Sequence, residues 1–283
     1  MVTEKAYAKL NLGLKLLNRR SDGFWNILSV MQTIDLYDTL IFKERTQEIE
    51  IKCTAPDVPS DSENLIVKAA QLMRKRLGVD RGVHVEVEKR IPVGGGLGGG
   101  SSDAAATLRA LNRLWNGGLG RDELFEIASL IGSDVPFFLK SGTAIVSGRG
   151  EVLEYINLPI RAYYVLIYPN FPVSTRWAYH NQKTSLTGES KYVNFIDSWK
   201  ERKEDGRLLY RNLENDFERL VEIHYPIIRE IREDLLSEGA IAVSLSGTGS
   251  TVYGVFKTLQ RAQLAAALLR KAGRTIFICQ PVC

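Results

Sequence analysis

The sequence predicts an α+β protein with two lobes. Segments with the alternation or short apolar runs of strands, and segments with the three- and four-residue spacing of helices, occur in both halves of the chain. A glycine-rich loop lies in the first half, and a glycine–serine turn lies in the second. Because 283 residues can bury a large core, one or two domains are expected. We predict two domains, an N-terminal one over 1–158 and a C-terminal one over 159–283.

Composition and charge narrow the class of protein. An apolar fraction of 45% and a charged fraction of 25% are typical of a globular protein, and no apolar run reaches the ~18 residues of a membrane span. The N-terminus lacks the apolar core and cleavage site of a secretory signal, so we expect a cytoplasmic protein. The net charge of +4 is spread along the chain, and its densest basic segments, 74–76 and 200–203, are expected to be exposed helix faces. We therefore expect neither a nucleic-acid nor a membrane partner. The sequence indicates no oligomeric state.

Cysteine and histidine form no metal pattern. The spacing of the three cysteines fits neither a zinc site nor a disulfide framework, so reduced thiols are expected. The three histidines are equally scattered, and the one in an expected strand is assigned a packing or surface role. These residues are Cys53, Cys279, Cys283, His84, His180 and His224.

Strands dominate the N-terminal region. Apolar runs predict strands over 6–17, 28–36 and 39–44, with the turn 18–23 between the first two. Residues 61–77 carry apolar side chains on one helical face and are expected to be helical. Residues 82–88 alternate, as a half-buried strand does, and lead directly into the glycine loop.

Helices and strands alternate after that loop. The apolar spacing of residues 102–115 predicts a helix, with Ser101, Ser102 or Asp103 as its cap. The remaining elements are expected as a helix over 122–131, a turn over 133–139, strands over 143–147, 152–156 and 163–168, an exposed loop and helix over 184–205, two helical segments over 215–239 divided at Pro226, strands over 240–245 and 251–256, a helix over 259–271 and a strand over 274–279.

The glycine loop predicts a phosphate site. Six glycines fall within seven positions, between a strand and the N-terminus of a helix. Unpaired N–H groups and the helix dipole favour an anion there, and glycines let the backbone approach phosphate oxygens closely. The loop is neither a Walker A sequence nor a dinucleotide-binding fingerprint, because it lacks the Gly-Lys-Ser/Thr ending and the later acidic residue. The alternative is a flexible surface turn, which would not need six glycines.

Two charged residues and a second turn extend this site. Lys9 lies in a nearly apolar strand, where it either extends toward solvent at a strand edge or serves the site. Asp134 precedes an apolar segment, where it either caps a turn or serves the site. Phosphoryl transfer needs a cation to offset phosphate charge and a carboxylate to orient or deprotonate the attacking hydroxyl. The turn 246–250 is a hairpin connection and a candidate second wall of the same cleft.

Together these motifs resemble the GHMP kinase superfamily. The three signatures stand in order as Lys9–Leu14 (KLNLGL), Pro92–Ala106 (PVGGGLGGGSSDAAA) and Ser246–Thr251 (SGTGST). The resemblance implies an N-terminal α/β lobe with a left-handed βαβ crossover, a ferredoxin-like C-terminal lobe and an active site between them. It also implies an ATP-dependent small-molecule kinase that uses Mg²⁺. No protein ligand for the metal is assigned.

The resemblance implies roles for individual residues. Asp134 would be the catalytic base or would position the substrate hydroxyl, and Lys9 would stabilise the transferred phosphoryl group and tune Asp134. Asn64 and Leu65 would help to form the adenine pocket. The residues expected around ATP are Asn64, Leu65, Pro92, Gly94, Gly95, Gly96, Leu97, Gly98, Gly99, Gly100, Ser101, Ser102, Asp103 and Ala104.

Further segments resemble those superfamily members that phosphorylate a hydroxyl of a cytidine-diphosphate-linked polyol in the non-mevalonate isoprenoid pathway. These segments are 133–139 (SDVPFFL), 173–179 (VSTRWAY) and 215–217 (NDF). The substrate would contact Asn11, Phe24, Trp25, Thr175, Tyr179 and Gly247. The sequence departs from the family pattern Asp-Gly-Tyr-His-x-Leu at 22–28 (DGFWNIL). Phe24 keeps a stacking face for the base, whereas Trp25 replaces a histidine and offers one donor and no acceptor.

The sequence leaves three possible functions to be tested. The first is the kinase for the cytidine-linked polyol. The second is a kinase of the same superfamily with another acceptor, an alternative that Trp25 in place of the expected histidine suggests. The third is an ATP-binding paralogue without catalysis, against which the presence of Lys9 and Asp134 argues.

Overall fold

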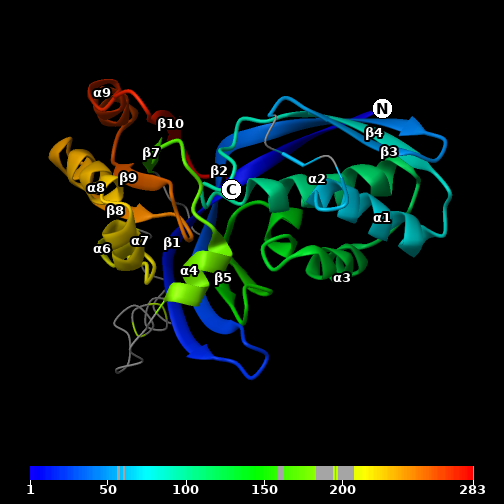
Figure 1. The fold of residues 1–283 in the computed structure, drawn as a ribbon, viewed down its shortest axis with the longest axis horizontal. Coiled ribbons are helices and arrows are strands. Elements are labelled where there is room, and N and C mark those ends of the chain that lie inside the picture. Colours follow the sequence, from blue (N-terminus) through cyan, green and yellow to red (C-terminus); the bar gives the residue numbers. More distant parts are fainter. Residues whose placement is uncertain are drawn as a thin grey trace. The chain divides into compact units, whose positions relative to one another are not determined.

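The computed structural model describes residues 1–55, 58–59, 61–157, 162–182, 194, 196 and 207–282 (Figure 1). The chain contains two compact units, each assembled from separate segments. The first unit comprises Met1–Ala8, Leu36–Val93 and Gly98–Ser141. The second comprises Lys9–Asp35, Gly94–Leu97 and Gly142–Cys283. The units are described separately below.

Two long strands, β1 (Val2–Arg19) and β2 (Trp25–Arg45), pair with each other and contribute residues to both units. The expectation of a break between 36 and 39 was wrong. Burial alternates without interruption through Leu36, Asp38 and Leu40, so the strand continues with a carboxylate in a buried position. That carboxylate has partners, described below, which make its burial possible.

The sheet of the first unit contains β4 (Gly82–Glu88), as the alternation predicts. It pairs antiparallel with Thr39–Arg45 of β2 and parallel with β3 (Ile49–Cys53), a strand that the sequence interpretation missed. Helix α1 (Leu65–Leu77) connects the two parallel strands, which completes a βαβ crossover.

Helices α1, α2 (Gly99–Leu114) and α3 (Arg121–Ile131) and the 3₁₀ helix η1 (Pro136–Leu139) pack together beside β3 and β4 (Figure 1). Helix α2 begins inside the glycine run, with Gly98 as its N-cap at a φ of 73° and without a side-chain cap. The expected cap at Ser101, Ser102 or Asp103 was therefore wrong. A left-handed glycine starts the helix earlier, which leaves those residues inside the helix.

In the second unit, Ser29–Gln32 of β2 pairs antiparallel with β5 (Thr143–Ser147), and β5 pairs with β6 (Val152–Ile156). A separate antiparallel sheet has the order β10-β7-β9-β8. Its strands are β7 (Tyr163–Tyr168), β8 (Ala242–Leu245), β9 (Val252–Phe256) and β10 (Thr275–Cys279). This order, with helices before β8 and after β9, is that of a ferredoxin-like βαββαβ motif.

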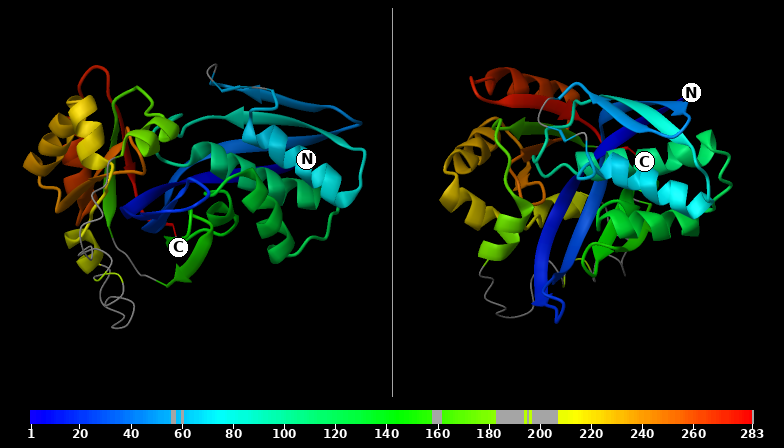
Figure 2. Two further views of the ribbon diagram at one scale, coloured as in Figure 1. Left: turned by 60° about the horizontal axis from the view of Figure 1, so that its bottom comes forward. Right: turned by 45° about the vertical axis from the view of Figure 1, so that its right-hand side comes forward.

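The helices of the second unit are α4 (Thr175–Asn181), α6 (Arg207–Arg211), α7 (Glu218–His224), α8 (Ile227–Ser237) and α9 (Leu259–Leu268). Both α8 and α9 pack against the ferredoxin-like sheet (Figure 2). Pro226 divides α7 from α8, as expected. Helix α4, capped by the Ser174 side chain, was missed. Of the predicted loop and helix over 184–205, all but residues 194 and 196 lie outside the described part, as does the basic segment 200–203.

The mixed α/β class with two lobes is confirmed. The domain boundary at 158/159 falls outside the described residues and stays a prediction. Cys53 and Cys279 are free thiols, and Cys283 is not described. Among the described residues, no helix is long and apolar enough to cross a bilayer, and no group of three His, Cys, Asp or Glu side chains could hold a metal ion.

Candidate active site

The tip of the glycine loop, Gly94–Leu97, is held by its carbonyl oxygens. Those of Gly94 and Gly95 accept hydrogen bonds from the backbone N–H groups of Val173 and Thr251, each at 3.2 Å. The carbonyl of Gly96 accepts from Lys9 Nζ (2.8 Å) and Ser246 Oγ (2.9 Å). The carbonyl of Leu97 accepts from the Lys9 N–H at 3.0 Å. All four carbonyls of this segment are therefore fixed by other parts of the second unit.

The N–H groups of the same segment are not used in this way. Among the hydrogen bonds of the described residues, none has a donor in the backbone of Gly94–Leu97. Gly94, Gly96 and Gly98 have positive φ values of 67°, 77° and 73°, whereas Gly95 and Leu97 do not. An alternation of this kind is typical of anion-binding nests, in which successive N–H groups face one side. The tip of the loop thus has its acceptors satisfied and its donors available.

The glycine–serine turn packs directly on this tip. A Cβ atom on Gly96 would overlap the Ser246 carbonyl oxygen, far inside the 3.0 Å limit that real Cβ atoms keep. A Cβ atom on Gly247 would lie 3.2 Å from both the Gly96 carbonyl oxygen and Lys9 Nζ. The turn therefore lies against the glycine loop, and its role as the second wall of one cleft stays a prediction.

Lys9 is buried on β1, with an exposed fraction of 3%. Its ammonium donates to Asn11 Oδ1 (2.5 Å) as well as to the Gly96 carbonyl. The amide of Asn11 donates in turn to Ser29 Oγ at 2.8 Å, which fixes the side of the amide that faces the lysine. The alternative of a lysine extending toward solvent at a strand edge was wrong, because its polar partners lie in the interior.

The expected substrate residues also lie in the second unit. Phe24 is 54% exposed in the turn between β1 and β2, and the Arg149 guanidinium lies 5.2 Å from its ring centroid. Trp25 begins β2 and is half-buried. Tyr179, on α4, packs edge-on against Phe217 with ring centroids 4.8 Å apart. The sandwich of a base between Phe24 and Tyr179 stays a prediction.

Two further residues that are expected to contact the substrate, Thr175 and Gly247, lie at the glycine–serine turn. Thr175 begins α4, and its hydroxyl lies 3.4 Å from that of Thr248 in this turn. The same turn contains Gly247, beside Lys9 and Asn11. Lys9, Asn11, Thr175 and Gly247 are therefore gathered around one turn.

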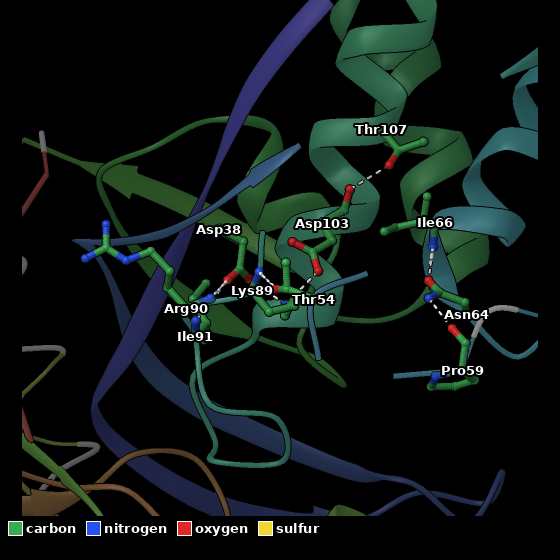
Figure 3. Close-up of polar contacts among 10 residues, drawn as sticks. All are labelled: Asp38, Thr54, Pro59, Asn64, Ile66, Lys89, Arg90, Ile91, Asp103 and Thr107. Carbon is green, nitrogen blue, oxygen red and sulfur yellow. Dashed lines mark hydrogen bonds and ion pairs between the residues drawn. The ribbon is translucent and has the colours of Figure 1, made fainter. Parts of the chain in front are cut away.

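In the first unit, Asn64 precedes α1 and caps it (Figure 3). Its Oδ1 accepts from the Ile66 N–H at 2.8 Å, and its Nδ2 donates to the Pro59 carbonyl at 2.6 Å. Leu65 follows as the first helical residue, and its Cδ1 would lie 3.8 Å from a Cβ atom on Gly100. The predicted adenine residues thus adjoin the first turn of α2.

The N-terminal part of α2 is joined to the segment that follows β4 by a buried cluster of charged side chains (Figure 3). Lys89 Nζ lies 2.5 Å from Asp38 Oδ2 and 2.7 Å from Asp103 Oδ2. Asp38 Oδ1 also accepts from the N–H groups of Arg90 (2.5 Å) and Ile91 (2.8 Å). Asp103 Oδ1 has no partner among the described residues. The segment entering the loop and the helix leaving it are therefore tied to one lysine.

The electrostatics of this cluster are asymmetric. Burial raises the pKa of Asp103 to about 7, with the nearby Asp38 adding to the rise and Lys89 opposing it. Burial alone would lower the pKa of Lys89, but the two carboxylates raise it above its ordinary value. The lysine stays charged, and Asp103 titrates near neutrality. Asp38 and Lys89 were missed as site residues, although each is a charged residue in or beside an apolar strand.

The other expected residues of the first unit occupy the loop exit and the segment after α3. Gly99, Gly100, Ser101, Ser102, Asp103 and Ala104 form the start of α2, and Pro92 precedes the tip. Asp134 is half-buried between α3 and η1. Because Asp134 belongs to the first unit and Lys9 to the second, their predicted pairing stays a prediction.

The chain is similar to known kinases over nearly its whole length. Residues 64–142 match the family model for the GHMP kinases N terminal domain, and residues 200–275 match the GHMP kinases C terminal model. The 4-diphosphocytidyl-2-C-methyl-D-erythritol kinase of Chlorobium phaeobacteroides (strain BS1) is 40% identical, covering 95% of this chain and 94% of that protein. The protein of the same name from Caldanaerobacter subterraneus subsp. tengcongensis is 43% identical, covering 91% and 88%.

Solved structures agree with these relatives. A crystal structure of 4-(cytidine 5'-diphospho)-2C-methyl-D-erythritol kinase superposes with a TM-score of 0.81 at 32% identity, covering 98% of each chain. A mevalonate kinase from Methanococcus jannaschii superposes with a TM-score of 0.75 at 15% identity, over 99% of this chain and 98% of that one, which shows a shared fold. The chain therefore belongs to the GHMP kinases, in the family of 4-diphosphocytidyl-2-C-methyl-D-erythritol kinases.

Proposed function

We propose that this chain is a cytoplasmic ATP-dependent kinase that phosphorylates the 2-hydroxyl of 4-diphosphocytidyl-2-C-methyl-D-erythritol, a step toward isoprenoid precursors outside the mevalonate route. The relatives that cover almost the whole chain carry this name. The observation that carries the proposal is the loop tip Gly94–Leu97, whose carbonyls are bound by the protein while its N–H groups are not.

ATP fits this backbone. The N–H groups of a nest and of a helix N-terminus bind phosphate oxygens without side chains, and glycine is required where a Cβ atom would intrude. Gly96 meets that condition because a Cβ atom there would overlap Ser246. We assign the phosphates to Gly94–Ser102 and the adenine to Asn64 and Leu65.

Phosphoryl transfer gives Lys9 and Asp134 one role each. The acceptor oxygen forms a bond to the γ-phosphorus while the bond from that phosphorus to the departing ADP oxygen breaks. Asp134 takes or orients the proton of the 2-hydroxyl, and Lys9 offsets the charge that spreads over the transferred group. The contacts of Lys9 with Asn11 and Gly96 hold its ammonium at the loop tip.

Mg²⁺ would neutralise charge on the β- and γ-phosphates. Among the described residues, no cluster of three acidic, histidine or cysteine side chains could hold it. Magnesium in kinases is bound by one or two carboxylates together with substrate phosphates, so the absence of a protein cage is compatible with its use. We propose no protein ligand for it.

The acceptor is recognised through the turn between β1 and β2 and through α4. Phe24 and Tyr179 supply aromatic faces for a base, while Asn11, Thr175 and Gly247 line the part of the site beside Lys9. The Trp25 indole has one N–H donor and no acceptor. Loss of a buried base-edge hydrogen bond costs about 1–3 kcal/mol, or about 10- to 100-fold in affinity.

Trp25 also favours a second candidate function, a GHMP kinase with another acceptor. Coupled ADP-release assays with Mg-ATP and a panel of the cytidine substrate, homoserine and mevalonate separate the two. We expect turnover with the cytidine substrate that disappears in Asp134→Ala. Turnover with another alcohol alone would support the second function. ATP binding without transfer to any acceptor would support a non-catalytic paralogue.

A further inference from the structure

Asn215 is a buried amide with every hydrogen-bonding group of its side chain in use. Its Nδ2 donates to the carbonyl oxygens of Leu245 (2.7 Å) and Gly247 (2.8 Å). Its Oδ1 accepts from the Phe217 N–H at 2.9 Å. The residue is 8% exposed, so water does not substitute easily for these partners. The two carbonyls flank Ser246, the first residue of the glycine–serine turn.

The backbone that carries this amide is itself fixed. Leu14 of β1 accepts from the Asp216 N–H (3.0 Å) and donates to the Glu214 carbonyl (2.7 Å). The Asp216 carboxylate accepts from the Leu16 N–H (2.7 Å) and from Lys15 Nζ (2.5 Å). Residues 214–216 therefore run alongside the same strand that carries the active-site lysine.

The turn that Asn215 holds is in contact with the loop tip. Ser246 Oγ donates to the Gly96 carbonyl at 2.9 Å, and the Ser246 carbonyl occupies the space where a Cβ atom on Gly96 would be. Gly247 lies against Lys9 Nζ and Asn11 Oδ1. A shift of the Leu245 or Gly247 carbonyl would thus move the atoms that set the peptide of Gly96.

We propose that Asn215 is a positioning residue for phosphoryl transfer, acting through Ser246 on the phosphate-binding peptide of Gly96. The inference rests on the proposed function for its kinetic consequence, but its structural route does not depend on the identity of the acceptor. An amide is required at this position because one planar group must give two hydrogen bonds and receive one. Aspartate has the same shape but, when ionised, places an acceptor oxygen where Nδ2 of the amide donates to the two carbonyl oxygens.

The test compares Asn215→Asp with a matched control, Asn112→Asp. Asn112 also joins its amide to the backbone, donating to the Leu119 carbonyl (2.9 Å) and accepting from the Leu119 N–H (3.0 Å), at the other end of α2 from the loop. Mg-ATP affinity is measured by calorimetry and turnover by ADP release, at a temperature where circular dichroism shows each variant to be folded.

We expect Asn215→Asp to weaken Mg-ATP binding and kcat/KM by about 10- to 100-fold, the equivalent of one or two lost buried hydrogen bonds, and the control to stay within about twofold. The defect of Asn215→Asp should shrink as the pH falls, because a protonated carboxyl regains one donor. Mg-ATP affinity and kcat/KM close to wild type in folded Asn215→Asp would overturn the proposal.

Ser246→Ala keeps the test decisive should Asn215→Asp fail to fold. It removes the hydroxyl that holds Gly96 and leaves the bonds of Asn215 intact, so it should produce a similar loss of Mg-ATP affinity. Unchanged affinity in Ser246→Ala would refute the route through Ser246. Absence of cytidine-substrate turnover in the wild type would contradict the proposed function alone, since the Mg-ATP affinities of the variants still decide the role of Asn215.

Discussion

Gly96→Ala tests the claim that the loop tip is shaped by contact with the glycine–serine turn. The residue has a φ of 77°, a left-handed conformation that costs a residue with a Cβ atom about 1–2 kcal/mol. In addition, the new Cβ atom would overlap the Ser246 carbonyl and lie 2.9 Å from the Gly249 carbonyl, whereas ordinary contacts begin at 3.4 Å. Both obstacles are backbone atoms, so no side-chain rotation relieves the overlap.

The loop must therefore move, by about 1 Å, and a displacement of that size costs about 100-fold in rate when it misplaces reacting groups. Gly118→Ala is the matched control, because Gly118 has a φ of 64° and a Cβ atom added there would have no neighbour within 4 Å. Thermal unfolding, Mg-ATP calorimetry and ADP release are measured for both variants. We expect both to lose stability, but only Gly96→Ala to lose Mg-ATP affinity and about 100-fold in kcat/KM. Equal ATP affinity in the two variants would refute the packing argument.

Three further predictions concern single side chains. The folded pKa of Asp103 is about 7, above its ordinary value of 3.8, so between these pH values the folded state binds a proton that the unfolded state does not. The free energy of unfolding should therefore fall as the pH rises from about 4 to about 7, and urea unfolding of Asp103→Asn should lack this fall. Parallel pH profiles for wild type and variant would contradict the assignment to Asp103. Asn64→Ala removes the N-cap of α1 and should cost about 1 kcal/mol of stability in urea unfolding; an unchanged midpoint would argue against the cap. Trp25→His should lower the KM for the cytidine substrate about 10-fold without changing the KM for ATP, because histidine restores a hydrogen-bond acceptor for the edge of the base. An unchanged KM for the cytidine substrate would show that residue 25 does not contact the base edge.

The sequence predicted those parts of the candidate site whose structure depends on residues close together in the chain. The glycine loop and the turn Ser246–Ser250 are defined by glycine content and by the elements beside them, and both occur where expected. The position of the loop between β4 and α2 was predictable because the strand and the amphipathic helix each have a regular spacing of apolar residues.

Residues that depend on distant partners were harder to predict. Asp38 is 51 positions from Lys89, and the sequence interpretation placed a break between two strands where β2 continues. Asn215 was noticed only as part of a family motif, because its function depends on the carbonyls of Leu245 and Gly247, about 30 residues away. For Lys9, the sequence left two alternatives, and burial with internal partners decided between them.

The most direct test of the central claim is to identify the product. The enzyme is incubated with Mg-ATP and 4-diphosphocytidyl-2-C-methyl-D-erythritol, and the product is examined by ³¹P NMR beside an Asp134→Ala reaction. We predict a new phosphate monoester on the 2-hydroxyl, formed together with ADP and absent from the Asp134→Ala reaction. Failure to form the monoester, or equal formation by wild type and Asp134→Ala, would contradict the account.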